Sequence, residues 1–108
     1  MSEPLVVLVT APESEAPALA SALVERRVAA CVNILPAVQS VFLWRGRVDR
    51  EQESLLICKT PHDGYAAFEA ALLELHSYEV PECIALEAHQ AHAAYAQWVV
   101  DSTRIGTE

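Results

Sequence analysis

The order of apolar patterns along the sequence predicts an α+β fold, a ferredoxin-like βαββαβ sandwich with an added C-terminal helix. Short continuous apolar runs alternate with segments whose apolar residues recur every three or four positions, as expected for strands and helices. Two apolar runs flank a two-residue Arg45-Gly46 loop, which predicts a long β-hairpin. No repeat, linker or low-complexity segment interrupts the sequence, so we expect one domain over residues 1–108.

The first half of the chain supplies a strand, a helix and the hairpin. Residues 4–10 are a continuous apolar run, which favours a strand that is buried on both faces. Residues 14–27 have the spacing of an amphipathic helix, and Ser14 is placed to cap its start. Residues 32–44 and 55–58 are the apolar arms of the hairpin.

The second half completes the pattern. Residues 60–63 have the sequence of a helix start, with a capping threonine, a proline at the first helical position and an acid in the first turn. This helix is expected to continue to Leu75. Residues 83–86 predict the last strand, residues 92–103 predict the added helix with a weak start at its histidine, and we expect residues 104–108 to fray.

The hydrophobic content and the hairpin both predict self-association. Hydrophobic residues make up 53% of the chain, and the mean hydropathy is +0.21, which is high for a domain with a small interior. A hairpin with a first arm of residues 32–44 extends beyond such a domain, and an unpaired apolar edge favours aggregation unless another chain covers it. We therefore expect an oligomer, in which Phe42, Trp44, Tyr78 and Trp98 are candidate interface residues because large aromatic side chains stabilise interfaces.

Charge and cysteine content restrict the compartment and the partners. The net charge of −8 and the single lysine argue against nucleic acid and anionic membranes as partners. The apolar run near the N-terminus is too short for a signal peptide or a spanning helix, so we expect a cytoplasmic protein. The three cysteines are odd in number and widely spaced, and no disulfide is predicted.

The sequence shows no catalytic signature, and we expect that the protein is not an enzyme. There is no Ser/His/Asp order, no glycine-rich nucleotide loop and no zinc spacing. His76, Glu79 and Glu82 lie close together on a loop and could coordinate a divalent ion, although a solvated loop or a subunit contact is the alternative. Cys31 is a soft ligand suited to copper(I), or else a packing residue at the start of the hairpin.

Several blocks of the sequence are distinctive: VTAP at 9–12, AACVNILP at 29–36, Trp44 with Gly46, LICKT at 56–60, YEVPE at 78–82, and Tyr95 with Trp98. Together these blocks resemble the CutA family of divalent-cation tolerance proteins. The resemblance implies a cytoplasmic homotrimer linked to tolerance of copper and other divalent metals, with copper or another divalent cation as a weakly bound ligand. Members suggested to bind copper carry cysteine and histidine where this chain has Val9 and Leu75.

Three functional interpretations remain open. The first is a trimeric tolerance protein that binds copper or another divalent cation weakly. The second is a module resembling the PII signalling proteins, which binds a small ligand between subunits and would need anion-binding groups such as Arg45, Arg47, Arg50 and Lys59. The third is a structural oligomer that serves as a scaffold.

Overall fold

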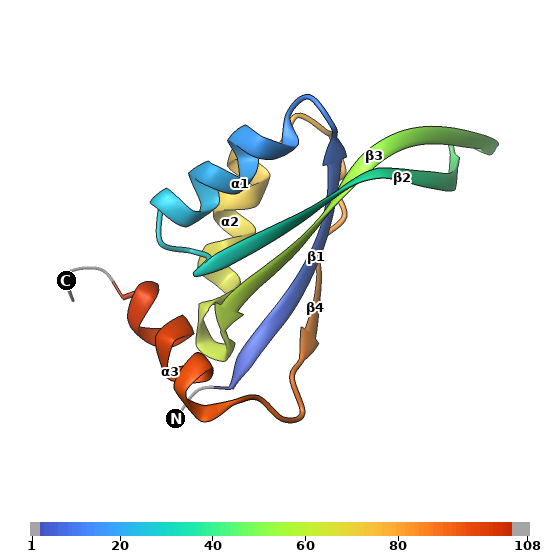
Figure 1. Ribbon diagram of the computed structural model, residues 1–108. Helices are drawn as coiled ribbons and strands as arrows, with labels where there is room; N and C mark the ends of the chain where they lie inside the picture. The colour runs from blue at the N-terminus through green and yellow to red at the C-terminus, as the bar shows by residue number, and fades with distance from the viewer. Residues whose placement is uncertain (1–2, 105–108) are drawn as a thin grey trace.

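A computed structural model describes residues 3–104, which form one four-stranded antiparallel sheet with helices packed against it (Figure 1). In chain order the elements are β1 (Pro4–Pro12), α1 (Ala16–Glu25), β2 (Cys31–Trp44), β3 (Arg47–Pro61), the 3-10 turn η1 (His62–Gly64), α2 (Tyr65–Leu75), β4 (Ile84–Glu87) and α3 (Ala93–Ser102). The strand order is β2-β3-β1-β4, and every pair is antiparallel. The ferredoxin-like prediction with an added C-terminal helix is confirmed, while residues 105–108, expected to fray, lie outside the described part.

The main core lies between the sheet and the two helices α1 and α2, which cover the same face of it (Figure 1). Alternate residues of β1 point into this core because side chains alternate across a strand. Val7 and Val9 are fully buried there, as are Leu56 of β3 and Phe68 of α2. The opposite face of β1 is half-exposed within one chain, so the expectation of a strand buried on both faces is not met.

Both predicted helix caps are wrong. Ser14 is exposed, and α1 begins after Glu15 without any side-chain cap hydrogen bond. Thr60 does not cap α2, because β3 continues through Pro61, whose extended backbone pairs with Pro4 of β1. The chain then makes the single turn η1 before α2 begins at Tyr65, and the Thr60 hydroxyl is buried without a hydrogen-bond partner among residues 3–104. The weak start expected for the last helix is confirmed: the side chain of its N-cap residue, His92, makes no cap hydrogen bond.

The hairpin is longer than predicted in its second arm, which begins at Arg47 rather than Leu55. Arg45 and Gly46 have φ values of 53° and 81°, as the two central residues of a type I′ turn require. The polar stretch 47–52 pairs with β2 although it is not an apolar run. This part of the hairpin projects beyond the core and is exposed, so polar side chains suit it (Figure 1). A bulge between Leu35 and Val38 shifts the register where the hairpin leaves the core.

The projecting part of the hairpin exposes apolar side chains. Leu43 is 72% exposed and Val48 69% exposed, values typical of residues that no core covers. Ile84 and Leu86 of the edge strand β4 are exposed as well. None of the helices within residues 3–104 is both long enough and apolar enough to cross a membrane.

Candidate functional site

A cleft of about 710 Å³ lies where the hairpin leaves the sandwich. Its walls come from the end of β1, from the two hairpin strands and from the loop that follows α2. The lining residues are Thr10, Ser40, Val41, Phe42, Trp44, Asp49, Glu51, Glu53, Tyr78, Glu79, Val80, Pro81 and Glu82. Five of these are carboxylates and three are aromatic, so the cleft combines negative charge with aromatic surface.

Glu53 is the buried carboxylate of this hairpin cleft. Its side chain lies at the base of the hairpin, the residue is only 5% exposed, and the Tyr78 hydroxyl donates a hydrogen bond of 2.5 Å to its Oε2 atom. Burial raises the pKa of Glu82, and the nearby negative charge of Glu53 raises it further. The two acids are therefore close enough for the charge of Glu53 to disfavour the charged form of Glu82.

His76 holds the loop that forms one wall of the cleft. The residue is buried, and its Nε2 atom lies 2.8 Å from the Thr10 carbonyl oxygen. Its Nδ1 atom accepts a hydrogen bond of 3.1 Å from the backbone N–H of Tyr78, so the proton of the neutral ring is on Nε2. The two rings also lie 4.6 Å apart. Both ring nitrogens are engaged within the chain, which gives His76 a positioning role in this arrangement.

The metal ligands expected from the sequence do not converge in one chain. Cys31 is paired across the ladder with Lys59, which pairs with Val6, whereas His76 bonds Thr10 at the other end of β1. Val6 and Thr10 are four positions apart in β1, about 13 Å along a strand. Glu79 is exposed and lies 3.7 Å from Arg45 in an ion pair. Within the described residues, no three His, Cys, Asp or Glu side chains are grouped to hold a metal ion.

Val9 and Leu75, the positions where relatives suggested to bind copper carry ligands, belong to the core here. Val9 is fully buried, and Leu75 packs partly buried against the same cluster. The Lys59 ammonium contacts the Asn33 carboxamide and lies 4.0 Å from the Cys31 thiol. All three cysteines are free thiols, and burial raises the pKa of Cys58 to about 12. Metal binding by His76, Cys31, Glu79 and Glu82 stays a prediction.

Of the four candidate interface residues, three have exposed side chains in the single chain. Phe42 and Trp44 are exposed on the hairpin, and Trp98 is exposed on α3, where its ring lies 5.5 Å from that of Tyr95. Tyr78 is half-buried and is engaged with Glu53. Residue patterns did not identify Glu53, because it lies in a polar stretch that resembles a solvated strand end.

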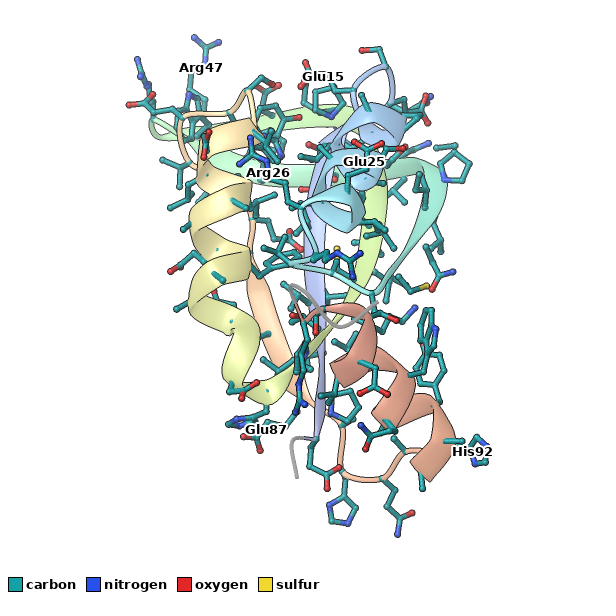
Figure 2. All side chains as sticks on the ribbon, turned by 90° about the vertical axis from the view of Figure 1, so that its left-hand side faces the viewer. Glu15, Glu25, Arg26, Arg47, Glu87 and His92 are labelled. Carbon is teal, nitrogen blue, oxygen red and sulfur yellow. The ribbon has the colours of Figure 1, made fainter. Side chains whose placement is uncertain are left out.

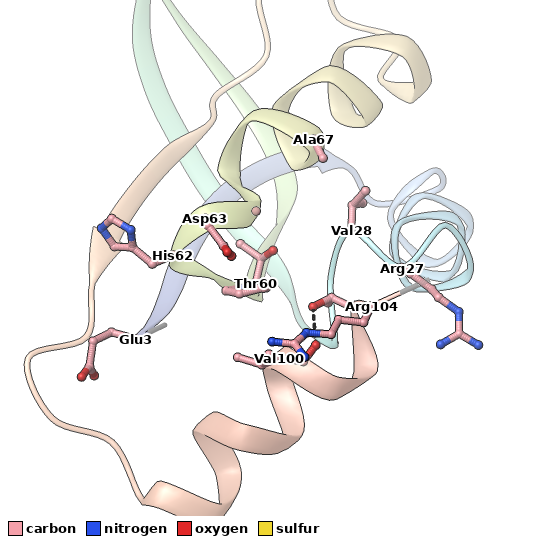
Figure 3. Close-up of a pocket in the computed structure, with 12 residues that line it drawn as sticks. Glu3, Arg27, Val28, Thr60, His62, Asp63, Ala67, Val100 and Arg104 are labelled. Carbon is pink, nitrogen blue, oxygen red and sulfur yellow. Dashed lines mark hydrogen bonds between the residues drawn. The ribbon is translucent and has the colours of Figure 1, made fainter. Parts of the chain in front are cut away.

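A second cavity, of about 800 Å³, lies at the opposite end of the molecule, between η1, the end of α1 and α3 (Figure 3). Its lining mixes Arg27, Arg104 and His62 with the acids Glu3 and Asp63. The two ends of the molecule are distinct: Arg47 and Glu15 lie at the hairpin end, whereas Glu87 and His92 lie at the other (Figure 2). This cavity has no single sign of charge, so it indicates no ligand class.

The fold and the cleft together define a class, that of small ferredoxin-like α+β proteins with a projecting hairpin. The chain matches the family model described as CutA1 divalent ion tolerance protein over residues 5–102, and it belongs to that family. A relative from Thermus thermophilus, a divalent-cation tolerance protein CutA, is 41% identical over 99 residues, 91% of this chain and 96% of that protein. A solved structure of the divalent cation tolerance protein from the same species is similar with a TM-score of 0.89 at 40% identity, covering 94% of this chain and 99% of that one.

Two further similar proteins come from other organisms. A structure described as the PII-like protein CutA from Nostoc sp. PCC 7120 has a TM-score of 0.89 at 31% identity, covering 94% of this chain and 98% of that one. The chloroplastic CutA 1 of rice is 41% identical over 93% of this chain, but the chain spans only 57% of its length. The family assignment and the ferredoxin-like fold are thereby established for this chain.

Proposed function

We propose that this protein serves divalent-cation tolerance as a cytoplasmic homotrimer that binds copper or another divalent cation weakly and catalyses no reaction. Membership of the tolerance family supports the general role. The exposed apolar side chains of the hairpin support the assembly, because a second chain would cover surface that one chain leaves in water.

The observation that carries the cation-binding part is the pair of carboxylates in the hairpin cleft. Glu53 is buried and hydrogen-bonded by Tyr78, and burial together with the negative charge of Glu53 raises the pKa of Glu82. A cation bound between them would offset the repulsion by Glu53 that raises the pKa of Glu82. Two carboxylates without a histidine or thiol form a weak, oxygen-donor site, which fits transient rather than tight binding.

Calorimetric titration of the purified protein with Cu(II) and Zn(II), with its mass measured by sedimentation equilibrium, tests the proposal. We expect the mass of three chains and weak heats of binding that Glu53→Gln and Glu82→Gln reduce. The matched control is Glu25→Gln at the exposed end of α1, which should leave the heats unchanged. A single-chain mass of 11.8 kDa would contradict the assembly, and heats unaffected by either cleft variant would contradict the site.

A second candidate function is a PII-like module that binds a small ligand. The volume of the hairpin cleft favours it, because about 710 Å³ is within the range of small-molecule sites and far exceeds the space needed by an ion. None of the anion-binding groups considered for such a ligand, Arg45, Arg47, Arg50 and Lys59, is among the described residues that line the cleft. Arg45 is paired with Glu79, and Lys59 lies beside Cys31, far from the cleft. If no titration with a metal ion or small ligand gives a heat of binding, a scaffold role would be favoured.

A further inference from the structure

We propose that Glu13 is a positioning residue, which fixes the direction in which the hairpin leaves the sandwich. It acts at the root of the hairpin, the short segment where Ala37, Gln52 and Glu53 lie. This role stands on hydrogen bonds within one chain. Its consequence for assembly rests on the proposed function, because the projecting part of the hairpin, residues 38–52, carries candidate interface residues.

The sheet narrows to two strands at one defined pair of residues. The last pair between β1 and β3 joins Pro12 with Glu53. From Gln52 to the turn, the partner of β3 within the described residues is β2. Two strands alone are marginally stable in water, and no third strand holds the direction of this part. Contacts at the root therefore largely decide that direction.

Glu13 directly follows the end of β1 and contacts both strands of the hairpin. Its Oε2 atom accepts a hydrogen bond from the backbone N–H of Ala37 in β2. Its Oε1 atom accepts a hydrogen bond of 3.1 Å from Nε2 of Gln52 in β3. Hydrogen bonds to an ionised carboxylate are stronger than those between neutral groups. One side chain thus joins the strand that ends to the two strands that continue.

Ala37 lies in the least regular part of the root. It belongs to the bulge between Leu35 and Val38, and its φ of 62° is left-handed, a conformation that disfavours residues other than glycine. Ala37 has no partner in the register of β2 and β3, so its N–H needs another acceptor. The Glu13 carboxylate supplies this acceptor and thereby holds the bulge in the geometry that bends the hairpin.

A second contact holds the root from the opposite face. Successive residues of a strand point to opposite faces of a sheet, so the side chains of Gln52 and Glu53 point in opposite directions. Glu13 accepts a hydrogen bond from Gln52, and Tyr78 donates one of 2.5 Å to Glu53. The root is therefore held between the β1–α1 loop and the α2–β4 loop, which meet at this end of the sandwich (Figure 1).

The ion pair nearer the tip of the hairpin is a weaker restraint. Arg45 lies 3.7 Å from Glu79, and both side chains are 73% exposed. Exposed ion pairs contribute little because water and salt screen them. The direction of the hairpin should therefore depend on its root more than on this pair.

Hydrogen exchange and residual dipolar couplings of backbone amides, both measured by NMR, test the role of Glu13. In Glu13→Ala we expect the Ala37 amide to exchange at least about tenfold faster and the amides of residues 38–52 at least about threefold faster. The amides of Val7 and Phe68 in the main core should keep their rates. The couplings of residues 38–52 should no longer fit the alignment of the core, because the direction of the hairpin varies.

The matched control is Glu15→Ala, because Glu15 lies in the same loop but accepts a hydrogen bond of 2.6 Å from the Ser77 hydroxyl. This variant should leave residues 38–52 at the parent rates. Glu13→Gln keeps one oxygen acceptor and should accelerate exchange less than Glu13→Ala. Parent rates and couplings in Glu13→Ala would overturn the proposal, as would equal acceleration in the core and the hairpin or the same effect in Glu15→Ala.

Sedimentation equilibrium on the same variants, in urea at which the parent begins to dissociate, separates this role from the assembly. In Glu13→Ala we expect about tenfold more protein to be needed for half-assembly, because a hairpin without a fixed direction loses more freedom on association. Faster exchange with unchanged assembly would refute this consequence and support the positioning role. A single-chain mass for the parent without urea would refute the proposed assembly, and the exchange rates of that chain would still decide the role of Glu13.

Discussion

Replacing His76 by phenylalanine should destabilise the protein without changing its affinity for metal ions. Phenylalanine keeps a buried ring against Tyr78 but removes the two nitrogens that contact the Thr10 carbonyl and the Tyr78 backbone N–H. Leaving a buried polar group without its hydrogen bond costs about 1 to 3 kcal/mol. Because Tyr78 is only half-buried and water can reach its backbone in part, we expect a total loss of about 2 to 4 kcal/mol for the two groups.

Urea denaturation at one fixed protein concentration measures this loss, because the concentration of assembled chains affects the midpoint. The denaturation midpoint should fall while the slope m is unchanged, and titration with Cu(II) should match the parent protein. A variant that keeps the parent midpoint but binds copper about tenfold more weakly would show that His76 is a ligand, and that its engagement of both nitrogens in one chain does not describe the functional state.

Four further results are expected. Burial raises the Cys58 pKa to about 12 from 9.0, so its stabilising contribution is complete below pH 9.0 and is lost as the pH rises toward 12; stability should fall less steeply over this range in Cys58→Ala, and equal slopes in urea titrations would contradict this. Gly46→Ala should lower the free energy of unfolding, measured by urea denaturation, by about 1 kcal/mol. The φ of Gly46 is 81° and no described atom lies within 4 Å of the added Cβ, so the cost is backbone strain. Cys31→Ser should leave Cu(I) affinity unchanged in a chelator competition, since the polar neighbours of its thiol, Lys59, Asn33 and Tyr95, offer no second soft ligand, and a clear loss of affinity would restore Cys31 as a ligand. The melting temperature should rise with protein concentration if unfolding and dissociation are coupled, whereas a constant value across dilutions would argue against an obligate assembly.

Local patterns predicted the elements well where one interaction dominates. The Arg45-Gly46 loop was predictable because a two-residue hairpin turn needs positive φ at both positions, and glycine supplies it cheaply at the second. The same patterns failed at helix starts. Residues 60–63 have a good capping sequence, yet pairing of Pro61 with Pro4 keeps this segment in the sheet and delays α2 until Tyr65. A long-range strand contact thus outweighed a local capping preference worth about 1 kcal/mol.

The sequence by itself determined the order of the elements, the hairpin and the family. Apolar periodicity, turn chemistry and blocks such as YEVPE at 78–82 depend only on residues close together in the sequence. Only the tertiary structure decided which side chains share a site. Glu53 and Tyr78 are 25 residues apart, and their hydrogen bond exists because the loop after α2 folds over the base of the hairpin. His76 and Cys31 both have ligand chemistry, but the register of β1, β2 and β3 places them at opposite ends of the sheet. Residue type limits what a side chain can bind, whereas distance and burial, which depend on contacts far apart in the chain, decide what it does bind.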